Sequence, residues 1–88
     1  MKHKIDLNSM VNSISTREDL VSFVRTLSND FNQNPLEWEN KNLGQYLEAM
    51  SAWIQDMDGY FKNTNQPMPT IIDWRVIGQI LLAAKIYE

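Results

Sequence analysis

Apolar residues recur at steps of three and four along most of the chain, which is the pattern of helices that each bury one face. The clearest stretch begins at Leu43 and continues over several turns to Tyr60 or Phe61. Similar patterns lie over residues 16–31 and 74–87, and no sustained alternation typical of strands is found. The sequence therefore predicts an all-α fold, a small single-domain bundle of three main helices plus one or two short ones.

Capping signals delimit these helices. The motif Ser15-Thr16-Arg17-Glu18 predicts a capping box, in which the Ser15 hydroxyl accepts an early backbone N–H and Glu18 reaches back. Pro35 suits the first position of a short turn over residues 35–39. The candidate caps of the later helices are Asn40 or Asn42 for the long helix and Thr70 or Asp73 for the last one.

The presence of Gly59 allows two interpretations of where the long helix ends. Asp58-Gly59-Tyr60 can form a C-cap in which Gly59 is left-handed. The apolar pattern nevertheless runs on to Phe61, and the asparagines that follow are an equally good stop. We favour the longer helix, to about residue 62, with Gly59 allowing close contact with another element.

We expect residues 1–14 to form an N-terminal arm or short helix and residues 15–88 to form one helical domain. Helices 43–62 and 74–87 are predicted to pack as an antiparallel pair, with helix 16–31 closing the third side. Apolar positions on the facing sides of these helices make up the predicted core: Leu20, Phe23, Val24, Leu27, Leu43, Leu47, Met50, Ile54, Met57, Ile77, Leu81 and Ala84.

Composition narrows the chemistry that is possible. With 88 residues the chain has room for one small core. Cysteine is absent, which excludes disulfides, thiolate metal sites and thiol catalysis, and the single histidine, His3, lies near the N-terminus. The net charge is −3, which disfavours a general nucleic-acid binder.

Neither a targeting signal nor a membrane segment is predicted. Asp6 and Asn8 interrupt any apolar run after the basic N-terminal residues, and the most apolar stretch, residues 76–84, is far shorter than the ~20 residues that span a bilayer. We expect a cytoplasmic protein that binds no membrane.

The segment Asp56-Met57-Asp58-Gly59 invites comparison with a calcium-binding loop. With the glycine at position 6, Ile54 falls at position 1 and Asn65 at position 12, where ligands are required. Two carboxylates two residues apart on a helix also point in different directions and cannot share a substrate. We therefore expect no metal ion, no cofactor and no enzymatic activity.

Three tryptophans lie near the apolar stripes. The simpler interpretation is that Trp38, Trp53 and Trp74 are all mostly buried core residues. Trp38 is the best candidate for an exposed one, because Glu37 and Glu39 flank it in a short turn. Tryptophan and tyrosine dominate the energetics of protein interfaces, so an exposed Trp38 would point to partner recognition.

Negative charge is concentrated between residues 30 and 60, where Lys41 is the only basic side chain among six acidic ones. The simplest interpretation is a solvated face that keeps the protein soluble. The functional interpretation is an acidic, aromatic-edged patch that steers a basic partner. The candidate partner-binding residues are Glu37, Trp38, Glu39, Glu48, Asp56, Asp58 and Tyr60.

Several short motifs together resemble a family of small bacterial domains of unknown function. They are Trp38-Glu39-Asn40, the run from Leu47 to Asn63 that contains Asp-Met-Asp-Gly-Tyr, Trp74-Arg75 and residues 82–88. The resemblance spans roughly residues 15–88 and implies an all-helical fold. It implies no activity, cofactor or catalytic residue.

Two functions from different classes follow. The first is a stoichiometric protein-interaction module, immunity- or inhibitor-like, whose partner is a basic protein or a second copy of the chain. The alternative is a small ligand-binding or enzymatic domain that uses the region of Asp56, Asp58, Trp53 and Tyr60.

Overall fold

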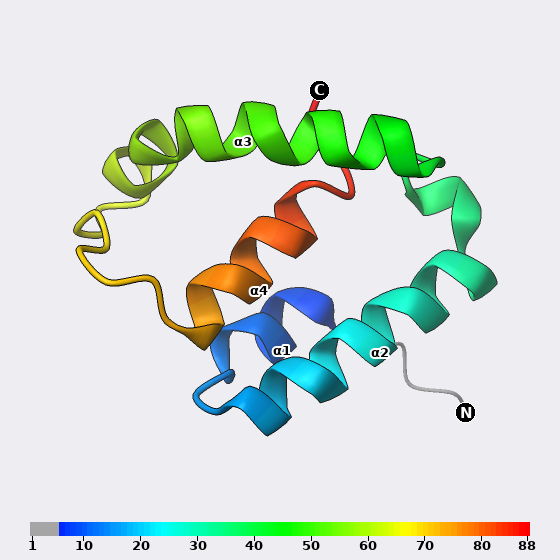
Figure 1. Cartoon of the computed structure of the whole chain (residues 1–88), viewed down its shortest axis with the longest axis horizontal. Coiled ribbons are helices and arrows are strands. Elements are labelled where there is room, and N and C mark those ends of the chain that lie inside the picture. Colours follow the sequence, from blue (N-terminus) through cyan, green and yellow to red (C-terminus); the bar gives the residue numbers. More distant parts are fainter. Residues whose placement is uncertain (1–5) are drawn as a thin grey trace.

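A computed structural model describes residues 6–88, and these contain helices and no strand. The predicted all-α class is thereby confirmed. Four α-helices and one 3-10 turn follow one another along the chain, and α4 lies in the middle of the arrangement (Figure 1). Their bounds are α1 Leu7–Asn12, α2 Arg17–Gln33, η1 Pro35–Glu37, α3 Leu43–Asn63 and α4 Trp74–Ala83.

The expected N-terminal arm contains a short helix, α1. Leu7, Val11 and Ile14 from this part of the chain are buried, and they belong to the same core as α2. The part of the predicted arm that precedes Asp6, which includes His3, lies outside the described residues.

A capping box starts α2, but it is shifted by one residue from the predicted one. Thr16 is the N-cap, and its hydroxyl accepts the backbone N–H of Asp19 at 3.0 Å. The Asp19 carboxylate in turn accepts the backbone N–H groups of Ser15 and Thr16, at 3.0 and 3.2 Å. A shorter acidic side chain at the third helical position therefore fills the role predicted for Glu18.

The long helix α3 continues through Gly59 to Asn63, so the longer of the two interpretations is confirmed. Asn42 is its N-cap and accepts the backbone N–H of Gln45 at 2.8 Å. The expectation that Gly59 makes room for another element is wrong, because a Cβ at this position would meet nothing within 4 Å.

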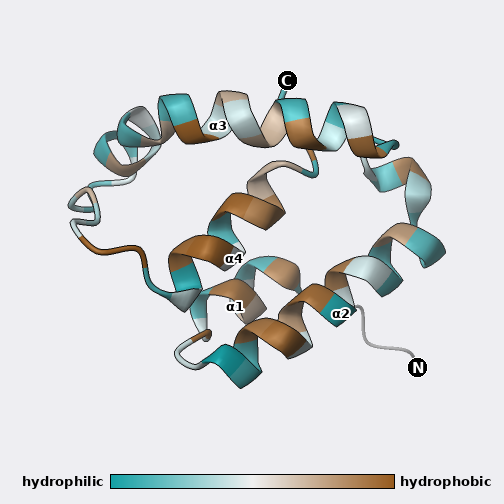
Figure 2. Cartoon of the chain, in the orientation of Figure 1, coloured by the Kyte–Doolittle hydropathy of each residue, from teal (hydrophilic) through white to brown (hydrophobic). Residues whose placement is uncertain are grey.

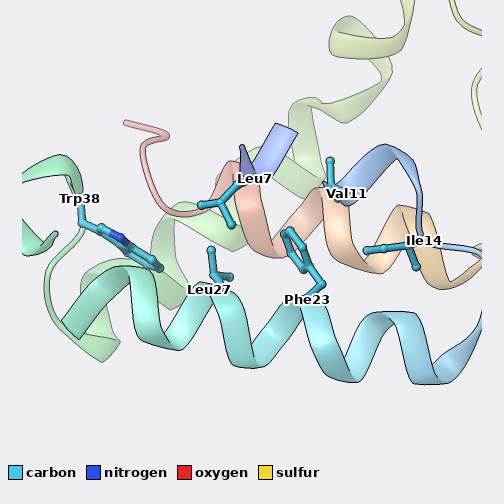
Figure 3. Packing of buried hydrophobic residues seen from close by; sticks show 6 residues of the cluster. All are labelled: Leu7, Val11, Ile14, Phe23, Leu27 and Trp38. Atoms are coloured by element: carbon cyan, nitrogen blue, oxygen red, sulfur yellow. The ribbon is translucent and has the colours of Figure 1, made fainter. Parts of the chain in front are cut away.

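One part of the core lies between α1, α2 and α4 (Figure 3). Phe23 and Leu27 point from α2 toward the side chains of α1, and Trp38 closes one end. Gly78 of α4 lies against α1, where a Cβ would come within 2.6 Å of Ile14 and 3.1 Å of Val11. The glycine therefore lets α4 approach α1 closely, and α4 runs through the centre of the bundle.

A second part of the core joins α3 to α4. It contains the buried side chains of Trp53, Met57, Phe61 and Val76. The two helices run in opposite general directions, as predicted (Figure 1). Within residues 6–88, α4 is the one helix whose backbone comes close to α3.

The buried face of α3 is rotated relative to the predicted one. Leu43, Leu47 and Ile54 were expected in the core, but they are 72%, 50% and 44% exposed. Ala49 and Trp53 are buried in their place, so the buried face is rotated about the helix axis by roughly a quarter of a turn from the predicted one. Val24 of α2 is likewise exposed rather than buried, at 42%. The predicted positions Phe23, Leu27, Met57 and Ala84 are buried, and Leu20, Met50, Ile77 and Leu81 are partly buried.

The helix α4 ends at Ala83 rather than at residue 87. Its N-cap is Asp73, one of the two predicted candidates, whose carboxylate accepts the backbone N–H of Val76 at 2.9 Å. Hydropathy is high along α4 and along the side of α2 that faces it, as expected for the central helix of a small bundle (Figure 2).

Candidate functional site

The predicted partner-binding residues do not converge on one surface. Glu48, Asp56 and Asp58 are exposed on α3, and successive helical residues are turned by about 100°, so these three carboxylates leave the helix in different directions. Asp56 accepts a hydrogen bond from the hydroxyl of Tyr87 at 2.6 Å. The Asp58 carboxylate accepts the backbone N–H of its neighbour Gly59 at 3.0 Å. The segment from Asp56 to Gly59 is helical, which agrees with the expectation that it is not a calcium loop.

The expected burial of Trp74 is wrong, because this side chain is 41% exposed, whereas Trp53 is buried as expected. Trp38 is also buried, at 6% exposed, which agrees with the core interpretation and contradicts the alternative of an exposed ring. Its indole N–H donates to the Asp30 carboxylate at 2.8 Å. Its ring meets Phe31 edge-on at 5.1 Å and lies 5.9 Å from the ring of Tyr46. The flanking residues Glu37 and Glu39 are exposed, so charged neighbours in sequence did not indicate an exposed tryptophan.

Asp30 is the centre of the polar cluster around Trp38. Besides the indole, it accepts the ammonium of Lys85 at 2.8 Å and the side-chain amide of Asn34 at 3.2 Å. Partial burial alone would raise the pKa of Asp30, but the hydrogen bonds from Lys85, Trp38 and Asn34 outweigh it and lower that pKa. Lys85 and Asp30 are each 12% exposed, so this ion pair is largely shielded from water.

The Trp38-Glu39-Asn40 motif holds the segment that follows α4. The backbone N–H groups of Glu39 and Asn40 both donate to the carbonyl of Lys85, each at 3.2 Å. The side-chain amide of Asn40 donates to the carbonyls of Ala84 and Tyr87, each at 2.9 Å. The motif therefore supplies donors to carbonyl groups that have no helical partner beyond the end of α4.

A pair of carboxyl groups lies on the outer side of this motif. The hydrogen bond between Glu39 and Glu88, followed by their electrostatic repulsion, raises the pKa of the Glu88 carboxyl. Both side chains are exposed. Glu39 of the predicted acidic patch thus lies next to Glu88, which was not among the predicted site residues.

A groove of about 510 Å³ runs between α1 and α3, and α4 forms its floor. Trp53 and Tyr60 line it from α3, with their rings 5.4 Å apart. Two of the predicted residues, Glu37 and Tyr60, lie at this groove, whereas Glu48, Asp56 and Asp58 do not line it. Among residues 6–88 the lining consists of Leu7, Asn8, Val11, Asn12, Glu37, Trp53, Tyr60, Gln79, Leu82, Ala83, Lys85, Ile86 and Tyr87.

Gln79 is the most informative side chain of the groove. Its Oε1 atom is buried and accepts no hydrogen bond from the part of the chain that the structure describes. A buried acceptor without a donor costs free energy, so an N–H or O–H group of a ligand would be favoured once the Gln79 side chain turns its oxygen, which is closed off from solvent, toward the groove. The sequence carried one signal for this residue, since Gln79 is the only amide side chain in the most apolar stretch of the chain.

No group of three or more histidine, cysteine, aspartate or glutamate side chains that could hold a metal ion occurs among residues 6–88. No helix in the described part of the chain has the length and apolar character needed to cross a membrane.

Comparison with curated proteins and with solved structures gives no significant match. A family model, in contrast, matches residues 16–88, which is all of the chain from α2 onward. The expected resemblance to a family of unknown function is confirmed to that extent. The chain belongs to DUF7660, a family of unknown function.

Proposed function

We propose that this chain is a protein-interaction module that binds one partner segment stoichiometrically in the groove between α1 and α3. The observation that carries the proposal is the buried Oε1 atom of Gln79 in the floor of a largely apolar groove. A partner segment that inserts an apolar side chain beside Trp53 and draws the Gln79 side chain toward the groove, where its oxygen accepts an N–H group, would satisfy both features.

The negative charge of this chain favours a basic partner. Glu39 and Glu88 repel each other next to the groove residues Glu37 and Tyr87. A lysine or arginine of the partner would relieve that repulsion and would speed association with a chain of net charge −3. Binding of a basic partner by a small acidic domain is the behaviour of an inhibitor or immunity protein, and we assign this chain to that kind of role.

The test begins with a peptide selected from a displayed library on the immobilised protein and titrated into isotope-labelled protein. NMR signals of Asn8, Tyr60 and the Gln79 side-chain amide should shift. Gln79→Leu should weaken binding about tenfold, because the partner's donor is left unpaired, and should leave the free protein equally or more stable. Gln55→Leu, a matched change on the exposed side of α3, should alter neither property.

Peptides whose signals map away from the groove, or that bind Gln79→Leu as tightly as the natural chain, would refute the proposal. Glu39→Lys provides the test of charge. It should slow association with a basic peptide and reduce the dependence of that rate on salt, while the dissociation rate changes little.

The second candidate is a small-molecule binding domain. The groove volume of about 510 Å³ lies within the range of ~300–1,000 Å³ that is usual for such sites, and Trp53 and Tyr60 offer two aromatic rings. A fragment screen by NMR separates this candidate from the first. A fragment that binds tightly and competes with every selected peptide would favour the small-molecule interpretation. We expect no enzymatic activity in either case.

A further inference from the structure

An apolar stripe runs along the first three turns of α3, beside the face of this helix that packs on α4. It consists of Leu43, Leu47 and Ile54, which are exposed, and Met50, which is partly buried. We call these four residues the α3 stripe. Because α4 is the one described helix close to α3, no other helix between residues 6 and 88 covers the stripe.

The spacing of the stripe is symmetric. Its residues follow one another at steps of four, three and four, which is the d-a-d-a pattern of a coiled-coil seam. The steps read the same from either end. Two copies of α3 placed side by side in opposite directions would therefore set Leu43 of one copy against Ile54 of the other, and Leu47 against Met50.

The charges at the two ends of the stripe fit the same arrangement. Lys41 precedes the stripe and Asp58 follows it, and both are exposed. In residues 6–88 Lys41 takes part in no ion pair. In the register set by the stripe, an antiparallel pair of copies places Lys41 of each within about two residues, or ~3 Å along the helix axis, of the level of Asp58 of the other, whereas a parallel pair would place like charges together.

Small side chains on one flank permit close approach. Gly44 and Ser51 lie on the same side of the stripe as Asp58, about four and two helical turns before it, and both are exposed. Helix axes approach each other most closely where the contacting side chains are small. The stripe thus has shape, spacing and end charges that match a second copy of itself.

We propose that the α3 stripe is the contact between two copies of this chain, paired antiparallel about a twofold axis. A helix of 21 residues is about 31 Å long, so one helix pair buries less than the roughly 800 Å² per partner of a standard interface. The dimer is therefore weak and forms at micromolar and higher concentrations. It leaves the groove between α1 and α3 open, so it does not depend on the proposed function.

Sedimentation equilibrium over low micromolar to near-millimolar concentrations tests the pairing. The natural chain should pass from monomer to dimer, and Leu47→Lys should raise the dissociation constant by about tenfold or more. The matched control is Val24→Lys on α2, at a position with a similar exposed fraction, 42% against 50%. A chain that stays monomeric throughout, or a Val24→Lys variant that weakens association as strongly, would overturn the proposal.

Charge reversal tests the direction of pairing. Lys41→Glu and Asp58→Lys should each raise the dissociation constant about two- to tenfold, and the double variant should restore it, because the pairs are then re-formed with exchanged signs. A double variant weaker than either single one would contradict the antiparallel arrangement.

The lack of cysteine allows an independent readout. A mixture of Leu43→Cys and Ile54→Cys chains should form a disulfide between the two variants under mild oxidation. Either variant alone should cross-link much less. Rapid cross-linking of Leu43→Cys to itself would show a parallel pair and overturn the proposal.

Discussion

At the scale of single residues, Asn40 links two distant parts of the chain. One carboxamide donates to two carbonyls beyond the end of α4, and the adjacent backbone N–H groups reach a third. Trp38 and Asp30 form the second half of this junction through Lys85. Trp38 was a candidate for partner recognition, and the motif that contains it thus has a structural role.

Replacement of Asn40 by alanine should destabilise the fold by about 1–3 kcal/mol, because two partly buried carbonyls lose their donor. Chemical denaturation measures the free energy of unfolding. Asn29→Ala, at an exposed position within α2, is the control and should change it by no more than ~0.5 kcal/mol. Equal effects of the two changes would contradict the structural role of Asn40.

Asp30 should contribute to acid unfolding. Its pKa in the folded protein lies below its ordinary value of 3.8, so its contribution to stability is present above that value and is lost as the pH falls through the lower, folded pKa. NMR titration of the Asp30 carboxyl should show a higher pKa in Lys85→Met, which removes the strongest of the donors. In Lys62→Met, which removes an exposed lysine from α3, the pKa of Asp30 should be unchanged.

At the scale of elements, hydrophobic spacing predicted the positions of α2, α3 and α4 but not the side of α3 that is buried. Leu47 and Trp53 both fit a helical stripe, and period alone does not decide which stripe meets α4. Which side of α3 is buried depends instead on how α4 packs. Gly78 allows α4 to pack closely on α1, and Val76 of α4 then contacts the buried side chains of α3. The N-cap of α2 was predicted to within one residue, and those of α3 and α4 were each one of two candidates, because N-caps depend on local hydrogen bonds.

Two of the three helical glycines, Gly59 and Gly78, should respond to alanine in opposite ways. Gly59→Ala should stabilise the protein by about 0.5–1 kcal/mol, because the helix gains a better helix former and nothing lies within 4 Å of the new methyl group. Gly78→Ala should destabilise it by about 1–3 kcal/mol, since the methyl group would press against the buried side chains of Ile14 and Val11. Thermal and chemical denaturation of both variants measures these changes, and a stabilised Gly78→Ala variant would contradict the close packing of α4 on α1.

At the scale of the whole molecule, α4 connects the other helices, and the candidate site depends on this arrangement. The groove combines residues of α1, α3 and α4 that no local pattern places together. The sequence analysis therefore found Tyr60 and Glu37 as candidates but assigned them to a different surface. Prediction of the groove would have required the relative placement of three helices, which depends on packing across the core rather than on periodicity.

The attachment of α3 through α4 alone should be visible in native-state hydrogen exchange. In the Leu47→Lys variant, where pairing of copies cannot contribute, amides of the first half of α3 should exchange through openings of lower free energy than those of α2 around Phe23. Equal protection in the two helices would mean that α3 does not open separately from the rest of the core.

The position of α4 also has a consequence for the rate of folding. Small helical proteins usually fold quickly because most of their contacts join residues that are near in sequence. Here the contact of Gly78 with Val11 joins the two ends of the described chain, and α1 and α2 complete their core only when α4 arrives. The entropy of closing that long loop must be overcome before the core stabilises the chain. Because of these long-range contacts, we expect this domain to fold more slowly than its helical content alone suggests. We expect the docking of α4 on α1 and α2 to be the rate-limiting step.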